Sequence, residues 1–495
     1  MVVSAHPLAT EAGHAVLQKG GNAFDAATAM AFMLAVAEPS MSGIGGRLQA
    51  MWHKPGKGTS GLDATTQAPA GYVRKPNESE DGYGTVGVPG MVKGIVAMHA
   101  AHGRLPLKDV MQPSIDAASK GFAFLPDELR RQSQVLKDTR VFEGTARHFI
   151  RNDTTPGPTE ALRQPALAAT LKTISKDGGK SFYNGGMAYD LAKEVEEGGG
   201  SLKLSDMEAY RATESKMLRG SYRGYEVVGM GLPCYGAIVI EMLHMLALTD
   251  LSRLDERDFL LTHAVVHYKA YNDRPLLRTK EDSLVVPSFA ENRWHDSLPP
   301  HIPRPAMARA DSANGHTTHF VATDREGNIV SITQSLGPIM GSKAASKKYG
   351  FLFATTMGPY LGTVKAGERA ASHISPIILY KDGQPVMALG AAGGARIVPA
   401  IVQVISRIVD QGMTPQQALA AARVFQNPDR LLVETHPEVY WREEGTWQRL
   451  QSSGHKVEAV RNPGQFGRIH MLLRKGGSWI GAADPDWSGT AMGER

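Results

Sequence analysis

Thr317 stands where a loop-like segment meets a run of residues that alternates like a strand. The approach is Ser312-Ala313-Asn314-Gly315-His316, and Thr318–Thr323 alternates apolar with polar residues. A threonine hydroxyl is a weak nucleophile and needs a base within hydrogen-bond reach. If the chain were cut before Thr317, the new α-amino group, with an ordinary pKa of about 7.7–8.0, would be that base. Threonine is also common at strand starts, so the residue alone leaves both interpretations open.

A glycine-rich turn follows the predicted strand Val386–Leu389 and opens a predicted helix that runs to about Gly412. The turn reads Gly390-Ala391-Ala392-Gly393-Gly394-Ala395-Arg396. Consecutive backbone N–H groups at a helix start can stabilise an oxyanion or bind a phosphate. The sequence matches neither GxGxxG nor GxxxxGK[ST], so a purely structural tight turn is an open alternative.

The elements that would position these segments alternate between strands and helices. The stretch Ala26–Ala37 is apolar on nearly every side, so we expect a buried helix with Asn22 as its N-cap. Residues 91–261 are expected to be mainly helical and residues 281–312 to form an exposed loop. Further elements are expected as follows: a helix over Pro7–Lys19, a long amphipathic helix over Asp255–Arg274, and strands at Val2–Ala5, Leu48–His53, within Arg219–Met230, at Ile329–Ser335 and at Ile377–Lys381.

Composition excludes several classes of protein. The chain has 495 residues and a net charge of +5, and its densest basic group, Lys343, Lys347 and Lys348, is expected in a solvated loop rather than a nucleic-acid site. The single cysteine, Cys234, cannot form an internal disulfide. The longest apolar stretch is too short to span a bilayer, so we expect no membrane contact. The N-terminus lacks the pattern of a signal peptide, and we expect a cytoplasmic protein.

The sequence indicates no cofactor and no metal. His263 and His267 have the i, i+4 spacing of helical metal ligands, but no glutamate follows His263 and no third ligand is evident. We therefore expect a surface or packing role for both histidines.

Many separate segments, in one order along the chain, resemble the γ-glutamyltranspeptidase family of N-terminal-nucleophile hydrolases. They are Ser4–Ala9, Gly20–Ala27, Glu38-Pro39, Ser42–Gly46, Val86–Gly90, Tyr222–Tyr225, Tyr271–Arg274, Thr317–Phe320, Asp324, Gly327-Asn328, Ser375-Pro376 and Gly393–Ile397. The resemblance covers nearly the whole length. It implies a mixed α/β fold, the four-layer αββα sandwich of these hydrolases, with Thr317 at the end of a central strand.

The resemblance also implies self-cleavage between His316 and Thr317. The pieces 1–316 and 317–495 would remain associated as a heterodimer within one domain. Further dimerisation of this heterodimer is left open by the sequence. The freed Thr317 would form an acyl-enzyme with a small-molecule amide. Ser335 would support the Thr317 amino group, and Gly393 and Gly394 would supply oxyanion-hole N–H groups. Thr333 matches a neighbouring family threonine and would contact the substrate.

The chain departs from the family where γ-glutamyl enzymes hold the substrate. Thr65 replaces the arginine that binds the α-carboxylate, and Pro359 stands in place of an acidic residue that binds the α-amino group. Gly337 replaces a pocket asparagine, and of the two pocket serines Ser372 is retained while His373 replaces the other. Each hydrogen bond to a charged group contributes roughly 1.5–3 kcal/mol, so both losses remove on the order of 3–6 kcal/mol of glutamyl recognition.

The sequence leaves replacements for these contacts open. Arg47 stands where family members have glycine and would either bind a carboxylate or lie at the surface, and His373 would either hydrogen-bond the acyl group or fill space. His316 and His319 flank the cleavage site and could assist cleavage.

We favour an amidohydrolase for a non-glutamyl amide, of the oxamate-amidohydrolase or acylase kind. The alternatives are a γ-glutamyl hydrolase or transpeptidase with a rebuilt clamp, and a non-catalytic binding protein.

Overall fold

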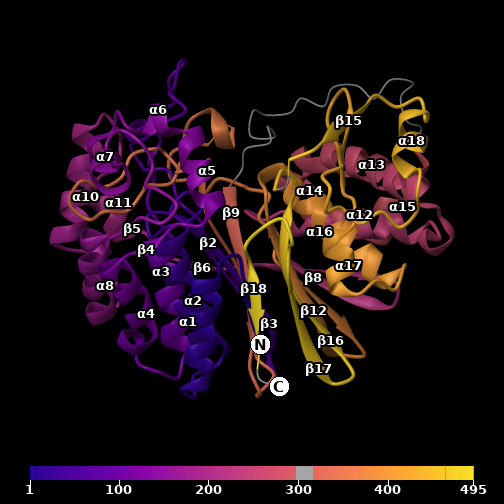
Figure 1. Cartoon of the computed structure of the whole chain (residues 1–495), viewed down its shortest axis with the longest axis horizontal. Helices are drawn as coiled ribbons and strands as arrows, with labels where there is room; N and C mark the ends of the chain where they lie inside the picture. Colours follow the sequence, from indigo (N-terminus) through magenta and orange to yellow (C-terminus); the bar gives the residue numbers. More distant parts are fainter. Residues whose placement is uncertain (297–315, 363, 463, 494–495) are drawn as a thin grey trace.

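Two β-sheets stand face to face in the centre of the molecule, and helices cover the outer face of each sheet (Figure 1). The computed structural model describes residues 1–296, 316–362, 364–462 and 464–493. This arrangement of helix, sheet, sheet and helix confirms the mixed α/β sandwich expected from the sequence. Residues 312–315, which approach the expected cleavage site, lie outside the described residues.

The first sheet has the strand order β18-β1-β9-β10-β2-β3-β6, and neighbouring strands are antiparallel. Its central strands are therefore β9 and β10, the predicted hairpin that begins at Thr317, and β2. The strands are β1 (Val2–Ser4), β2 (Arg47–Lys54), β3 (Gly58–Ala64), β6 (Thr213–Glu214), β9 (His316–Thr323), β10 (Ile329–Gly337) and β18 (Thr490–Met492).

The second sheet has the strand order β17-β16-β12-β11-β8-β7. Its strands are β7 (Met217–Tyr222), β8 (Tyr225–Met230), β11 (Ile377–Lys381), β12 (Gln384–Ala392), β16 (Arg468–Lys475) and β17 (Ser478–Ala483). Two small sheets lie outside the sandwich and comprise β4 (Phe122–Ala123) with β5 (Ala161–Leu162), and β13 (Val424–Gln426) with β14 (Leu431–Glu434) and β15 (Val457–Val460).

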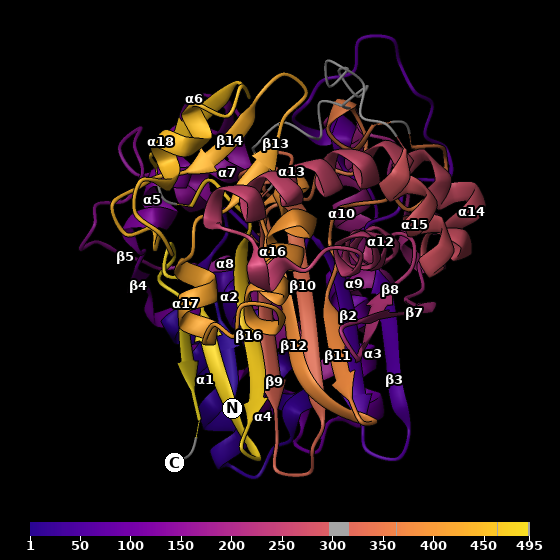
Figure 2. The ribbon, with the colours of Figure 1, turned by 90° about the vertical axis from the view of Figure 1, so that its right-hand side faces the viewer.

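Helices from the first half of the chain cover the first sheet, and later helices cover the second (Figures 1 and 2). The first group is α1 (Pro7–Gln18), α2 (Ala23–Ala37), α3 (Met91–His102), α4 (Leu107–Lys120), α5 (Pro126–Gln134), α6 (Leu136–Thr139), α7 (Glu143–Phe149), α8 (Pro165–Asp177), α9 (Lys180–Tyr183), α10 (Gly186–Glu197) and α11 (Leu204–Ala209). The second group is α12 (Gly236–Ala247), α13 (Glu256–Asp273), α14 (Leu277–Leu284), α15 (Pro287–His295), α16 (Ile397–Val409), α17 (Pro415–Ala420) and α18 (Thr446–Gln451). Within the described residues, none of these helices combines the length and apolar character needed to cross a membrane.

Helix α2 lies directly behind the strands of the expected site and is buried along its entire length, as predicted. Asn22 caps it by accepting hydrogen bonds from Phe24 and Asp25, and Asp25 in return accepts from the Asn22 backbone. This reciprocal cap satisfies amide groups that burial would otherwise leave without partners. The helix thus forms a rigid support for β9 and β10, with which it is in contact.

Two predictions about local structure were wrong. Residues 281–295 form the end of α14 and all of α15 rather than an exposed loop, because Phe289 and Trp294 pack against the apolar core of the second helix layer. The rest of that predicted loop lies outside the described residues. Lys343 is buried, and its Nζ donates to the Ile339 carbonyl and lies 3.7 Å from Asp81. Lys347 and Lys348 are exposed, as expected.

The glycine-rich turn predicted over residues 390–396 begins later in the structure, at Gly393. Residues 390–392 continue strand β12 and pair with β16, so only Gly393 separates the strand from the one-turn 3₁₀ helix Gly394–Arg396 and α16. The small side chains are required here because the two sheets approach closely. A Cβ atom at Gly390 would lie 2.4 Å from the imidazole of His319 on the opposing sheet.

We predict that Gly390→Ala lowers the free energy of unfolding by about 1–3 kcal/mol, because a methyl group would force the sheets apart or displace the His319 ring. The matched control is Gly186→Ala in α10, where an added Cβ meets nothing within 4 Å and alanine favours the helix. Thermal denaturation of both variants measures the effect. Equal melting temperatures for wild type and Gly390→Ala would contradict the close approach.

Candidate active site

Three neighbouring strands of the first sheet bring Thr317, Ser335 and Arg47 into a row. Ser335 on β10 pairs directly with Arg47 on β2. Between Gln334 and Gly337 the register of β10 against β9 shifts by one residue, which places a bulge opposite Thr317. Bulges redirect side chains and are frequent beside active sites. Thr317 and Ser335 are each 4% exposed, so this row lies inside the molecule.

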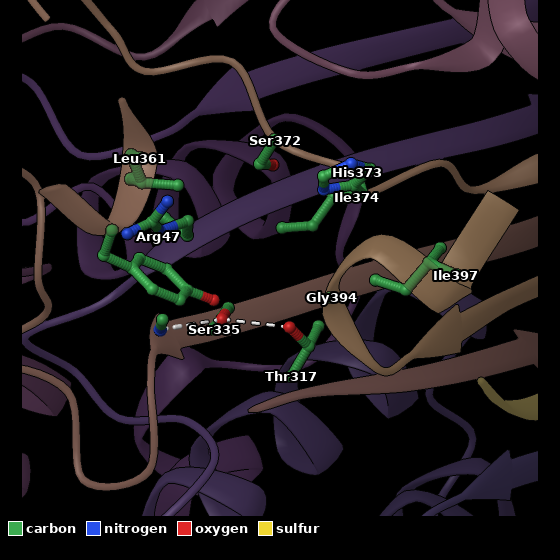
Figure 3. A pocket seen from close by; sticks show the side chains of 11 residues that line it. Arg47, Thr317, Ser335, Leu361, Ser372, His373, Ile374, Gly394 and Ile397 are labelled. Atoms are coloured by element: carbon green, nitrogen blue, oxygen red, sulfur yellow. Dashed lines mark hydrogen bonds between the residues drawn. The ribbon is translucent and has the colours of Figure 1, made fainter. Parts of the chain in front are cut away.

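These residues line a small pocket between the two sheets, with a volume of about 30 Å³. Figure 3 shows Ser335 between Thr317 and Arg47, with Gly394 and Ile397 on the Thr317 side and Ser372 and His373 across the pocket. The structure therefore gathers most of the expected site residues around one small cavity. Its lining consists of Arg47, Thr317, Ser335, Gly337, Tyr360, Leu361, Ser372, His373, Ile374, Gly394 and Ile397.

The Ser335 hydroxyl connects the two residues that flank the expected cleavage site. Thr317 Oγ1 donates a hydrogen bond to Ser335 Oγ over 3.0 Å, and Ser335 Oγ donates to the His316 carbonyl over 2.8 Å. The backbone N–H of Gly337 donates to the same Ser335 oxygen over 2.9 Å. The serine is therefore held in one orientation, in contact with both the nucleophile candidate and the carbonyl group that precedes it.

The glycine pair is only partly at the pocket. Gly394 lines it, whereas Gly393 lies one residue behind, with a φ of 138° that L side chains rarely adopt. A Cβ at Gly393 would also lie 3.0 Å from the Cα of Gly467. Gly393 thus sets the path of the turn, and Gly394 begins the 3₁₀ turn that leads into α16.

A buried network of ion pairs around Arg423 lies next to this turn. Arg423 donates to the Gly467 carbonyl over 2.6 Å and forms ion pairs with Glu434 and Asp484. Since Gly467 packs against Gly393, the network connects the small third sheet to the glycine turn. Of the described residues, Glu434, His436 and Asp486 have a spacing that could hold a metal ion. Arg423 already contacts Glu434 there, and the cluster lies away from the pocket lining.

Two candidate residues have positions that sequence patterns did not reveal. Thr333 is absent from the pocket lining, and its hydroxyl lies 2.8 Å from His319 Nδ1 in the interior between the sheets, so its expected contact with substrate is corrected to a packing role. Arg47 is 1% exposed, so the surface alternative for it was wrong. Its guanidinium donates to the Thr355 carbonyl, and its Nε has no hydrogen-bond partner among the described residues.

His373 is held at the pocket edge by its neighbours. Its ring stacks on Tyr271 and meets Tyr235 edge-on, and its Nε2 lies 3.3 Å from Nη1 of Arg274. The position is compatible with either alternative left open by the sequence, contact with an acyl group or space filling. Tyr360 and Ile374 also line the pocket, and no sequence signal identified them.

Of the other histidines singled out in the sequence, His319, His263 and His267 are buried and His316 is half-buried. Burial, together with the charges of Arg468 and Arg131, lowers the pKa of His316 well below its usual range. Burial likewise lowers the pKa of His319, which lies between the sheets. His263 contacts Ser406 Oγ, and His267 accepts from the Gln426 backbone, which confirms their packing role.

Glu38, at the C-cap of α2, is a buried acid beside Thr318, and the sequence indicated it only as part of the family segment Glu38-Pro39. Its carboxylate accepts a hydrogen bond from Thr318 Oγ1 over 3.0 Å and lies 3.9 Å from Arg131. Burial raises its pKa from 4.5 to about 7, against the opposing charge of Arg131. A group whose pKa rises on folding contributes stability that is present below pH 4.5 and is lost as the pH passes through 7.

We therefore predict that Glu38→Gln, which removes the charge but keeps an acceptor for Thr318, is more stable than wild type at pH 8 by up to about 3 kcal/mol. The difference should shrink toward pH 5, where the wild-type carboxyl is protonated in the folded protein. Melting temperatures of both proteins across this range test the prediction. A variant that is less stable at pH 8, with an unchanged pH dependence, would contradict it.

The fold is that of an N-terminal-nucleophile hydrolase, and comparisons with known proteins agree. A family model described as Gamma-glutamyltranspeptidase matches residues 9–494. The chain is 30% identical to the glutathione hydrolase proenzyme of Bacillus subtilis (strain 168), with 100% of this chain and 91% of the relative covered. It is 31% identical to the Acylase ACY 1 proenzyme of Pseudomonas sp. (strain V22), with 98% and 91% covered.

Solved structures show the same relationship. The cephalosporin acylase from Bacillus halodurans superposes with a TM-score of 0.89 at 26% identity, over 100% of this chain and 96% of that one. Helicobacter pylori gamma-glutamyltranspeptidase gives a TM-score of 0.57 at 29% identity, over 60% and 92%. The chain belongs to the gamma-glutamyltranspeptidase family and is an amidohydrolase of its N-terminal-nucleophile class.

Proposed function

We propose that the chain cleaves itself before Thr317 and then hydrolyses a small non-glutamyl amide through an acyl-enzyme on Thr317. The observation that carries this proposal is the position of the Thr317 hydroxyl, which lines a small pocket and is hydrogen-bonded to a serine that also contacts the His316 carbonyl. The relatives named above are proenzymes, which supports processing of this chain as well.

In the proposed cleavage, Thr317 Oγ1 attacks the carbonyl carbon of His316. The peptide C–N bond breaks as the new C–O ester bond forms, and the amide nitrogen takes up the proton lost by Thr317 Oγ1 and becomes the α-amino group of Thr317. Water then hydrolyses the ester and leaves the His316 carboxylate. Ser335 polarises the carbonyl oxygen during the attack because its hydroxyl donates to that atom.

In the proposed turnover, the freed α-amino group takes the proton from Thr317 Oγ1 as the hydroxyl attacks the substrate amide. The acyl C–N bond breaks, and the amine leaves with that proton. Water, activated by the same amino group, then releases the acid. Backbone N–H groups of the turn at Gly394 would stabilise the oxyanion; the position of Gly394 in the pocket lining beside Thr317 supports this role.

Three positions support an acyl group other than γ-glutamyl. Thr65, which replaces the family arginine, hydrogen-bonds to Gln49 and does not line the pocket. Pro359 carries no charge, and its neighbours Tyr360 and Leu361 close that side of the cavity. Gly337 offers no side chain. The match to a glutathione hydrolase proenzyme over the whole chain keeps a γ-glutamyl activity with a rebuilt clamp as the second candidate.

Hydrolysis of matched anilides separates the two candidates. We expect the γ-glutamyl anilide to be hydrolysed at least 100-fold more slowly than the best simple-acyl anilide. The reason is that the chain lacks the two charged side chains that would bind the α-carboxylate and the α-amino group of the glutamyl group. Mass spectrometry should also detect an acyl adduct on Thr317 during turnover. Faster release from the γ-glutamyl compound would favour the second candidate. A processed protein that never forms an adduct would instead favour the non-catalytic alternative.

A further inference from the structure

We propose that a second cavity, on the outer face of the first sheet, binds a small aromatic carboxylate. The cavity has a volume of about 290 Å³ and lies between the β2–β3 hairpin and helix α3. This site lies away from Thr317, so its ligand goes beyond the proposed function and does not depend on it. The shape of the cavity, its aromatic wall and its charges carry the inference.

Strand β2 has the active-site pocket on one face and the second cavity on the other. Trp52 lines the cavity and belongs to the apolar core of the first helix layer. Its sequence neighbours Met51 and His53 face the second sheet, where His53 Nδ1 lies 3.0 Å from the Tyr380 hydroxyl. Arg47, which lines the active-site pocket, lies on that inner face, about 17 Å along β2 from Trp52. The cavity is therefore a separate site.

Small side chains on α3 leave room for a ligand. Ala97 and Ala101 lie one helical turn apart and line the cavity opposite the hairpin, and Met98 and Leu62 add to its apolar lining. A cavity of about 150 Å³ is large enough to hold benzene. The volume here is about twice that, so the cavity accommodates an aromatic ring that carries a short substituent.

Aromatic side chains form one wall of the cavity. Trp52 meets Phe24 edge-on, with ring centroids 6.1 Å apart, and its ring centroid lies 5.3 Å from that of His102. Both Trp52 and His102 line the cavity, and these ring contacts hold the indole in place. Aromatic rings pair favourably with one another in edge-on and offset geometries. The wall is therefore preorganised for an aromatic ligand.

Positive charge gathers at the hairpin end of the cavity. Lys54 ends β2, Lys57 lies in the turn that follows, and both line the cavity. Burial and the charges of these two lysines lower the pKa of His102, because both ammonium groups lie near this lining residue. Neither lysine forms an ion pair with a carboxylate of the described residues, and Lys54 Nζ lies 5.5 Å from the ring centroid of Phe24. A ligand carboxylate would supply the missing negative charge.

The acids around the cavity do not neutralise this end. Glu214 also lines the cavity, but it stands on β6 and pairs with Leu62, at the end of β3 far from the turn. Glu326 lies near Lys54, but it forms an ion pair with Arg104, and the contact with Arg104 is the main reason that its pKa is lowered. The cavity is therefore cationic at the hairpin end and apolar along its length. This combination matches an aromatic ring that carries a carboxylate.

Isothermal titration calorimetry with four small ligands tests the inference. Phenylacetate carries both the ring and the carboxylate, 2-phenylethanol keeps the ring without a charge, 2-phenylethylamine reverses the charge, and acetate lacks the ring. We expect phenylacetate to bind at least about 10-fold more tightly than each of the other three. Absence of saturable phenylacetate binding up to about 10 mM, or equally tight binding of the alcohol or the amine, would overturn the inference.

Variants locate the bound ligand. Ala101→Phe fills the cavity from an exposed position of α3 and should abolish phenylacetate binding. Lys57→Met keeps an aliphatic side chain but removes the charge, so it should weaken phenylacetate binding by about 10-fold. Lys475→Met, at an exposed lysine on β16 of the second sheet, is the matched control and should keep the wild-type affinity.

Phenylacetate binding that survives Ala101→Phe would place the ligand at another site and refute the inference. Wild-type affinity in Lys57→Met would refute it as well. Because Lys57 is an exposed turn residue, that variant decides the question if Ala101→Phe fails to fold.

Binding at this cavity needs neither cleavage before Thr317 nor hydrolysis of an amide. Thr317→Ala should therefore bind phenylacetate with the wild-type affinity, and a loss of binding in this variant would place the ligand in the active-site pocket instead. Failure of the proposed function would leave phenylacetate binding unchanged. Failure of the inference would leave self-cleavage and anilide hydrolysis unchanged.

Discussion

Thr317→Ala is expected to remain a single uncut chain and to have no measurable amidase activity. Alanine has no hydroxyl to attack the His316 carbonyl, so neither the cleavage nor the later acyl-enzyme can form. The fold should persist because the methyl side chain removes only one buried hydrogen bond, the 3.0 Å contact to Ser335. Denaturing gels report the cleavage, anilide hydrolysis reports the activity, and a melting curve confirms folding.

Thr317→Ser is the matched control for this variant, since it keeps a hydroxyl at the same place. It should cleave itself and retain activity, at a rate reduced by the freer rotation of the serine side chain. A Thr317→Ala protein that still yields two pieces or hydrolyses anilides would show that another residue is the nucleophile.

Ser335→Ala is expected to slow self-cleavage by about 100- to 1,000-fold, a loss typical of removing one hydrogen-bond donor to a developing oxyanion. The variant loses the donor to the His316 carbonyl and the acceptor for Thr317 in one change. The time course of intact mass after synthesis measures cleavage separately from turnover. Ser335→Thr, which keeps the hydroxyl and suits a strand, should restore most of the rate. Cleavage of Ser335→Ala at the wild-type rate would contradict the assigned role.

The hairpin that carries Thr317 was predictable because its signals are local. Apolar and polar residues alternate before and after a turn between Asp324 and Asn328, and this pattern predicts two paired strands. Strands β9 and β10 are found there. The buried helix α2 and its Asn22 cap followed from the same kind of pattern. The αββα architecture came from the family resemblance, since no local pattern specifies how two sheets pack.

The position of Arg47 could not be predicted from its neighbours in sequence. Its burial depends on the pairing of β2 with β10 and on Thr355, a residue far along the chain, which accepts its hydrogen bond. The orientation of Thr333 could not be predicted from local sequence either. Its contact with His319 directs its hydroxyl away from the pocket. The helices over residues 281–295 were missed because long-range packing of Phe289 and Trp294 outweighs a local composition typical of loops.

Intact mass of the purified wild-type protein tests whether Thr317 becomes the N-terminal residue of a processed enzyme. We expect two masses that correspond to residues 1–316 and 317–495, with a free threonine amine at the start of the smaller piece. A single mass for the full 495-residue chain in a preparation that hydrolyses amides would contradict it.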